Sequence, residues 1–361
     1  MNKLLPIILC VGLIASCQKK VTTPENKTEQ EIQLFASSMP VAIGSKASNI
    51  MPDAFGVGSA IGLYTQRKAD SDLGSTTLMT NNKANSRYNF ATPLWSVESR
   101  DDKLVYHITD PIYIFGYHPH SDIVGGSVKM PDAAAPHMLD FSLATDQSTS
   151  ESLRLSDFMW CRASNNDLGY VRQSEPVSLL FGHQLCKVSI SIRLYDSRPL
   201  GGVRESASVE SIKFSGAEIY STSTFNVLNG TLTPSNGHAS VSWTPASTPL
   251  TIPVGSNTDQ ATFVSDFILI PFVATTSSNK IEYVLKFADS ATPITFYSTI
   301  PVYDGTTLSP TPADGNKMRF GRNDYNKITV SIDVSSSFVS IDASIIPWGD
   351  GASTDLDGQR Q

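Results

Sequence analysis

Apolar and polar residues alternate with a period of two along most of this chain, and this pattern constrains the fold more than any other feature. In one run, Ile281, Tyr283 and Leu285 alternate with Glu282 and Lys286, and residues 103–109 follow the same pattern. Successive side chains of a strand point to opposite faces, so such runs predict half-buried strands. No segment of a dozen residues sustains the 3.6-residue period of a helix. We therefore predict an all-β fold.

Turn signals separate the alternating runs. Each signal is a pair of residues that tolerates the positive backbone angles of tight hairpin turns. The pairs are Gly201-Gly202, Asn229-Gly230, Asn236-Gly237, Asp304-Gly305 and Asp314-Gly315. Many short strands with frequent turns are typical of antiparallel β-sandwiches.

A polar stretch over residues 165–176 separates two strongly apolar regions. We place a domain boundary there, which predicts an N-terminal β-sandwich domain over residues 32–174 and a C-terminal one over residues 175–361. The chain is long enough for two domains that each bury a core. The second domain should contain a principal strand within residues 179–194. There we expect Val188 and Ile190 on the apolar face and Lys187 and Ser189 on the polar face.

The first 16 residues read as a signal peptide. Lys3 precedes an apolar run that ends at Ile14, and this run is shorter than the about 20 residues that span a bilayer. Ile14, Ala15, Ser16 and Cys17 together fit a lipobox, which predicts cleavage between Ser16 and Cys17 and attachment of acyl chains such as palmitate to the Cys17 thiol. The alternative is an ordinary secretory leader followed by an incidental cysteine.

The residues after the leader say more about compartment and partners. Residues 17–31 are polar and read as a flexible tether to the outer membrane. The formal net charge is −7 with both signs interspersed, so nucleic acid is excluded as a partner. Cys161 and Cys186 either pair in an oxidising compartment or stay as buried free thiols.

Two alternating runs end the chain, and three serines separate them. The second run places Val339, Ile341, Ala343 and Ile345 on one face. Such a strand can add to an open sheet edge of another molecule. Within one molecule it can equally be the final strand of the second sandwich, and alternation alone favours this second interpretation.

The order of several aromatic-rich segments resembles the bacterial fimbrillin family, also called Mfa-like or type V pilins. The resemblance covers nearly the whole chain after the leader. Its segments are residues 32–36 (IQLFA), 55–64 (FGVGSAIGLY), 112–119 (IYIFGYHP), 157–160 (DFMW), 181–190 (FGHQLCKVSI), 325–330 (YNKITV) and 346–348 (IPW).

The resemblance implies two transthyretin-like sandwich domains in tandem and a role as a fimbrial subunit that supports adhesion. Fimbrillins are exported as lipoproteins, lose an N-terminal strand to a protease and polymerise with other subunits by strand exchange. By position, the lost strand is 32–36, and a strand from 338–346 replaces it, with Trp348 as its anchor. The cut falls at Lys46-Ala47, although family members often present Arg there. Arg67-Lys68 is a second candidate cut.

The resemblance leaves other roles open. The family also contains anchor and tip subunits, which keep the leader strand or lack a usable donor strand. A carbohydrate-binding adhesin on the same architecture is a further alternative, and Trp95, Trp160 and Trp243 are its candidate binding residues.

The sequence gives weak support for an enzymatic function. His118, His120 and Asp122, with Asp110 nearby, would hold a metal if the two histidines faced one way along a strand. Pro119 interrupts that strand, so a solvated loop is the preferred interpretation. His183 is expected to be a hydrogen-bonded structural residue. The sequence contains neither GxSxG nor HExxH, and we predict no enzymatic activity, metal or cofactor.

Overall fold

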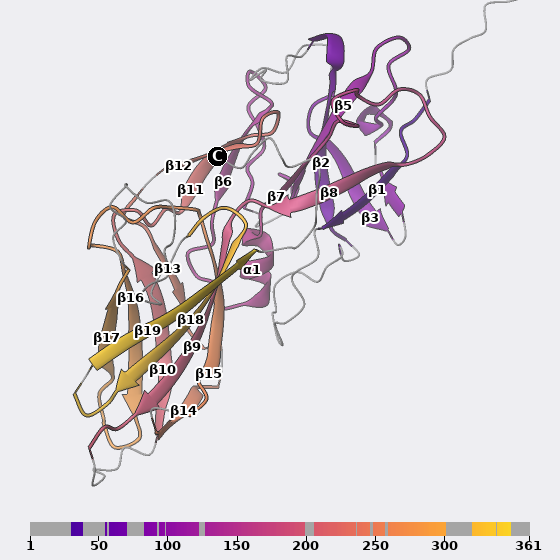
Figure 1. Cartoon of the computed structure of the whole chain (residues 1–361). Helices are drawn as coiled ribbons and strands as arrows, with labels where there is room; N and C mark the ends of the chain where they lie inside the picture. Colours follow the sequence, from indigo (N-terminus) through magenta and orange to yellow (C-terminus); the bar gives the residue numbers. More distant parts are fainter. Residues whose placement is uncertain are drawn as a thin grey trace, which may run out of the picture.

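The computed structural model consists mainly of strands (Figure 1). It describes residues 30–38, 55, 58–70, 83–91, 94–97, 99–122, 127–198, 206–235, 237–245, 248–256, 259–300, 320–336 and 338–347. Among these residues the helices are α1 (Ser150–Ser156), which begins at a capping box, and two short 3₁₀ helices, η1 (Lys68–Asp70) and η2 (Arg100–Asp102). None of these helices has the length and apolarity needed to cross a membrane. The prediction of an all-β fold is confirmed.

The first large sheet has seven strands in the order β1-β8-β7-β5-β2-β3-β4. All neighbours pair antiparallel except β1 and β8, which are parallel. β4 lies close to β1, so the sheet is nearly closed. The strands are β1 (Leu34–Ser38), β2 (Ala60–Arg67), β3 (Ser86–Ala91), β4 (Leu94–Ser96), β5 (Ile112–His118), β7 (Met159–Ala163) and β8 (Val177–His183).

The second large sheet has nine strands. Seven follow the order β17-β16-β10-β14-β9-β18-β19, while β13 pairs with β10 and β15 pairs with β9. β9 is parallel to both β14 and β18. The strands are β9 (Cys186–Tyr195), β10 (Ser206–Ser215), β13 (Ser240–Trp243), β14 (Leu250–Gly255), β15 (Thr262–Leu269), β16 (Lys280–Phe287), β17 (Ile294–Thr299), β18 (Asp324–Asp333) and β19 (Phe338–Pro347).

A small antiparallel sheet joins the two large ones (Figure 1). Its strands are β6 (Met138–Ser142), β11 (Thr222–Asn226) and β12 (Thr231–Ser235), so it takes one strand from before β7 and two from after β10. The predicted turn at Asn229-Gly230 connects β11 to β12, and Gly230 has a φ of 71°. Phe158 packs edge-on against Phe225 with ring centroids 4.8 Å apart, and the indole of Trp160 donates to the carbonyl of Val227 at 2.8 Å.

The chain passes from the seven-stranded to the nine-stranded sheet between His183 and Cys186. β8 therefore belongs to the first sheet although it follows the predicted boundary at residue 174. The polar stretch over residues 165–176 is a loop between β7 and β8 of the same sheet. Polar composition marked an exposed connection there, whereas the chain crosses between the sheets at His183 and Gln184, two polar residues that are buried.

Two further expectations need correction. The sheets are mixed, because three of the strand pairs are parallel. Residues 103–109 form no strand and only an isolated bridge at Val105. Leu104 and Tyr106 are buried as expected from their alternation, whereas Ile108 is exposed. Alternation thus identified the inward-facing residues there, but among the described residues their strand pairing is limited to the short bridge between Val105 and Glu31.

Candidate functional site

β1 is an edge strand of the first sheet, and its buried side chains join the apolar core of that sheet. Its pairing places Leu34 beside Val177 and Ala36 beside Leu179. Ile32, Leu34 and Ala36 are buried, whereas Phe35 is 58% exposed, as period-two alternation requires. β1 thus contributes one apolar face to the core and pairs its backbone along β8.

The residues just before β1 are attached to the fold as well. The side chain of Gln30 donates to the carbonyl of Gln173 at 2.6 Å, and Lys103 forms an ion pair with Glu31 at 2.6 Å. The backbone N–H of Ile32 donates to the carbonyl of Leu104 at 2.9 Å. Gln30 and Glu31 therefore belong with β1 rather than with the predicted tether over 17–31. The rest of that tether, with Ser16 and Cys17, lies outside the described residues.

The predicted cut lies in the link that follows β1. Lys46 and Ala47 lie outside the described residues, between β1 and the buried ring of Phe55. Phe55 packs edge-on against Trp95 and Phe181, with ring centroids 5.1 and 5.4 Å apart. Phe55 therefore anchors the chain on the far side of the link, and a cut inside it leaves this anchor in place.

Arg67-Lys68 is a poor second site for the cut. Arg67 ends β2, which lies between β3 and β5 inside the sheet, and its guanidinium binds both carboxylate oxygens of Asp70. The backbone N–H of Lys68 donates to the carbonyl of Pro111 at 2.8 Å. A protease would have to unfold an interior strand to reach this bond, and the cut would release β2 as well as β1.

The candidate donor strand is the last strand of the chain's own second sheet. β19 pairs antiparallel with β18 over its whole length, with Ala343 opposite Ile328, Ile341 opposite Val330 and Val339 opposite Ile332. Val339, Ile341 and Ala343 are partly buried against the core. Ile345 lies opposite Asn326 in the register, and Trp348 lies outside the described residues. β19 ends the sheet order, so its other edge forms no ladder within the described part of the chain.

A carboxylate network holds the turn between β18 and β19. Asp333 accepts hydrogen bonds from the hydroxyl groups of Ser197, Ser335 and Ser336 at 2.5–2.9 Å, and from the backbone N–H of Ser335 at 3.0 Å. Partial burial raises the pKa of Asp333, but the donated hydrogen bonds outweigh this effect and hold the pKa below its ordinary value. The ionised carboxylate therefore favours the hairpin that keeps β19 on its own sheet.

The two histidines of the proposed metal site have different surroundings. A cis peptide bond joins His118 to Pro119. The His118 ring is fully buried and packs 5.2 Å from the ring of Phe55, and neither of its nitrogens has a hydrogen-bond partner among the described residues. The His120 ring stacks on Tyr117 instead, with centroids 6.0 Å apart. The two histidines do not face one way, because β5 ends at His118 and the two rings pack against different neighbours. The preferred interpretation of a solvated loop is wrong as well, because both rings are buried.

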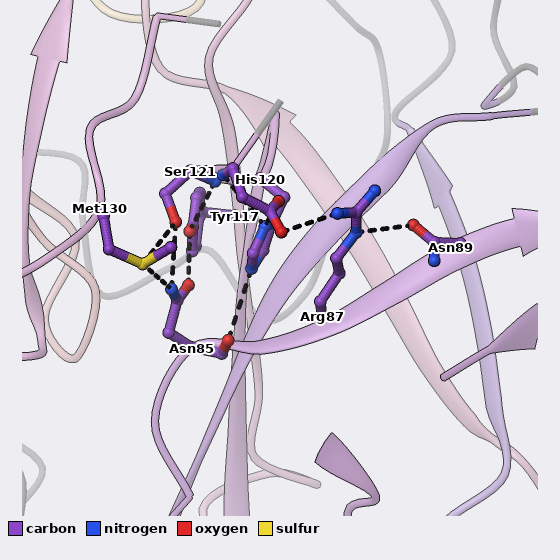
Figure 2. A network of polar contacts seen from close by, with 8 residues as sticks. Asn85, Arg87, Asn89, Tyr117, His120, Ser121 and Met130 are labelled. Atoms are coloured by element: carbon purple, nitrogen blue, oxygen red, sulfur yellow. Dashed lines mark hydrogen bonds and ion pairs between the residues drawn. The ribbon is translucent and has the colours of Figure 1, made fainter. Parts of the chain in front are cut away.

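Figure 2 shows His120 within a polar network that closes one end of the first sheet. His120 contacts Asp122, and Asp122 accepts a hydrogen bond from Arg87 at 2.7 Å. The hydroxyl of Tyr117 donates to Asn85 at 2.5 Å. Burial raises the pKa of Asp122, but hydrogen bonds from His120 and Arg87 lower it overall. Within the described residues no three His, Cys, Asp or Glu side chains are placed to hold a metal.

The remaining candidate residues have structural roles. The ring of His183 is buried and hydrogen-bonds Asp157 at 2.7 Å, which confirms the predicted structural histidine. Cys161 and Cys186 are buried and form no disulfide, which agrees with the alternative of two buried thiols. Trp95 and Trp160 are buried, so neither presents its ring to a carbohydrate.

One buried cluster was not predicted from the sequence. Lys187 was expected on the polar face of its strand, but its side chain is fully buried beside Asp266. β9 pairs with β14, β15 and β18, and both of its faces are covered near its start. A signal was present in the sequence, since Asp266 stands alone in the apolar run over residues 263–273.

Comparison with known proteins identifies the family of this chain. The model of the Fimbrillin-like family matches residues 47–348. The chain belongs to this family. The match covers both large sheets and begins after β1, and it confirms the resemblance found in the sequence.

Solved structures similar to this Fimbrillin-like chain include proteins of Bacteroides species. A fimbrial protein of Bacteroides vulgatus is 13% identical with a TM-score of 0.56 and covers 88% of this chain and 99% of its own. A proposed cell adhesion protein of Bacteroides ovatus is 15% identical with a TM-score of 0.55 and covers 89% and 99%. At these identities the likeness shows the fold. Comparison with curated proteins found no match.

Proposed function

We propose that this chain is the precursor of a fimbrial subunit that assembles by strand exchange and supports adhesion. Membership of the Fimbrillin-like family supports the fimbrial role, and the similar structures include a fimbrial protein and proposed cell adhesion proteins. The observation that carries the assembly mechanism is the position of β1, an edge strand with a buried apolar face beside β8. In this proposal the two large sheets correspond to two transthyretin-like domains in tandem.

Loss of β1 would open a groove that another strand can fill. The backbone groups of β8 that pair with Leu34–Ser38 would lose their partners, and the apolar surface beneath Leu34 and Ala36 would meet water. Unpaired backbone groups and exposed apolar surface are both costly. A new strand that pairs with β8 restores both interactions, so the proposed polymer is stable once it forms.

The incoming strand in this proposal is β19 of a neighbouring subunit. Its alternation of Val339, Ile341, Ala343 and Ile345 matches the inward-facing period of Ile32, Leu34 and Ala36. β19 first has to leave β18, which it can do without breaking an interior ladder because it lies at the end of the sheet order. The Asp333 turn is the local interaction that opposes this release.

Export precedes assembly in this proposal. The leader over residues 1–16 directs the chain through the periplasm, and acylated Cys17 carries it to the outer membrane. A cut at Lys46-Ala47 then releases Cys17 together with β1. The cut frees the subunit from its lipid in the same step that opens its groove.

Treatment of the purified full chain with a trypsin-like protease tests the proposal. We expect loss of the residues up to Lys46, followed by a ladder of oligomers that survives SDS without boiling. The Lys46→Gln variant should stay uncut and monomeric, whereas the matched Lys27→Gln variant should behave as the parent chain. A clean cut that never yields oligomers would contradict the proposal. An uncut chain in cells would instead make it a permanently lipidated anchor.

Deletion of residues 338–361 provides a second test. The truncated chain should accept a donor strand from an intact subunit but donate none, so mixtures should give capped dimers rather than ladders. Global unfolding of the truncated chain, measured by near-UV circular dichroism, would show that β19 is indispensable to its own sheet.

A further inference from the structure

A lysine and an aspartate lie side by side in the interior of the second sheet. Nζ of Lys187 on β9 is 3.7 Å from Oδ2 of Asp266 on the neighbouring strand β15. Their side chains are 0% and 4% exposed. Burial of two opposite charges costs several kcal/mol per ion, and the attraction between them rarely offsets this cost completely.

The surroundings keep water away from the pair. Nζ of Lys187 lies 4.5 Å from the centroid of the buried ring of Tyr325 on β18. Ser189 donates a hydrogen bond to Oδ1 of Asp266 and also contacts the Tyr325 hydroxyl at 2.8 Å. The amine therefore faces Oδ2, while a fixed hydroxyl donor is aimed at the other oxygen of the same carboxyl group.

Desolvation acts on both groups in the direction that makes them reactive. Burial lowers the pKa of Lys187 and raises the pKa of Asp266, although the attraction between the two opposes each shift. A neutral amine is a nucleophile, and a protonated carboxyl group has a better leaving oxygen than a carboxylate. The buried pair thus favours the uncharged partners of a condensation.

We propose that Lys187 and Asp266 form an intramolecular amide bond between β9 and β15. In this reaction the Nζ lone pair attacks Cγ of Asp266, and Ser189 stabilises the negative charge that develops on Oδ1. The bond between Cγ and Oδ2 then breaks, and Oδ2 leaves as water with the carboxyl proton and one amine proton. The condensation is redox-neutral and needs no co-reactant.

The positions of the two side chains, in contact and closed to water, favour this condensation. Two groups held in contact react as one unimolecular system, and a site closed to water protects the amide from hydrolysis. The product would join β9, which also pairs with β14 and β18, covalently to β15. Such a bond resists separation of these strands under load, whatever the mode of assembly.

Peptide mapping of the purified full chain under denaturing, reducing conditions tests this inference. We expect trypsin to leave the bond after Lys187 uncut. We also expect a branched peptide that carries Lys187 and Asp266 and weighs one water molecule less than its two parts. Recovery of linear peptides that end at Lys187, in the yield of other tryptic peptides, would overturn the inference.

Two variants distinguish the proposed amide bond from other reactions in which the chain loses a water molecule. The branched peptide should disappear in Lys187→Met and persist in Lys327→Met, a matched control because Lys327 lies 5.2 Å from the centroid of the same Tyr325 ring. A loss of water that survives in Lys187→Met would also overturn the inference. The result for the parent chain stands by itself if Lys187→Met does not fold.

Discussion

Leu34 of β1 lies directly beside Val177 of β8 in a parallel pair, and both side chains are buried. The two residues come from opposite ends of the first sheet's sequence, yet they meet at its edge. An edge strand can be lost without breaking the ladders between the other strands. β1 lies at one end of the strand order, as β4 does at the other, and the proposed removal of β1 requires such a position.

The packing of β1 predicts unequal effects for two neighbouring substitutions. Leu34→Ala should lower the free energy of unfolding of the uncut chain by about 2–4 kcal/mol, because it deletes buried methyl groups. Phe35→Ala should change it by less than about 0.5 kcal/mol, because this side chain is mostly exposed. Denaturant titration measures both values. Equal costs would show that β1 does not occupy its groove in solution, and the difference should vanish after the proposed cut.

The buried ring of His118 predicts acid sensitivity. Burial lowers the pKa of His118 from 6.5 to about 4, and the nearby Asp157 only partly offsets the effect. Between pH 6.5 and about 4 the unfolded chain therefore binds a proton at this residue that the folded chain does not. As the pH falls through this window, protonation of this residue should lower the free energy of unfolding by about 3 kcal/mol.

Substitution of His118 separates its contribution to the pH dependence of stability from that of other groups. His118→Phe should remove its share of the pH dependence, as measured by denaturant titration at several pH values, whereas His107→Phe in an exposed loop should retain it. An unchanged pH profile in His118→Phe would assign the acid sensitivity to other groups.

Loss of the buried pair of Asp157 and His183 should destabilise the chain more than loss of an exposed pair. Asp157→Ala would leave the buried His183 ring without this partner, and the free energy of unfolding should fall by about 1–3 kcal/mol. Glu151→Ala breaks a bidentate pair with Arg154 on exposed α1 and should cost less than about 1 kcal/mol. Thermal melts of both variants provide the comparison. Similar costs would argue that the two pairs are equally solvated.

Gly62 predicts a steric conflict at the centre of the first sheet. A Cβ atom at this position would lie 2.1 Å from the ring of Tyr117, which hydrogen bonds to Asn85 and Ser121 hold in place (Figure 2). Gly62→Ala should therefore destabilise the chain by about 1–3 kcal/mol. Tyr117→Leu in the same chain should relieve part of this cost, so a double-mutant cycle should show coupling. Additive effects would mean that the ring moves freely.

Local patterns predicted much of the fold but failed where a second layer covered a strand. Residues 187–195 alternate as a half-buried strand should, yet Lys187 is fully buried because β9 is covered on both faces near its start. The limit between the sheets was misplaced for a related reason. The chain crosses from one sheet to the other at His183 and Gln184, and because these two polar residues are buried, they do not mark an exposed link.

The candidate site was predicted in part. The β18–β19 hairpin and the inward face of β19 followed from alternation, the strand at residues 32–36 followed from the family resemblance, and the structural role of His183 followed from its position in the sequence. The metal hypothesis failed because it assumed that His118 and His120 extend one strand. The chain turns at Pro119, and the two rings enter different surroundings.

The sequence by itself determined that this chain is all-β and where many of its strands and turns lie. These properties are local, since side-chain alternation and turn chemistry act over a few neighbouring residues. The tertiary structure alone decided that β1 pairs in parallel with β8 and that Lys187 meets Asp266. Each of these depends on which distant strands pack together to bury apolar surface, and no local pattern encodes that choice.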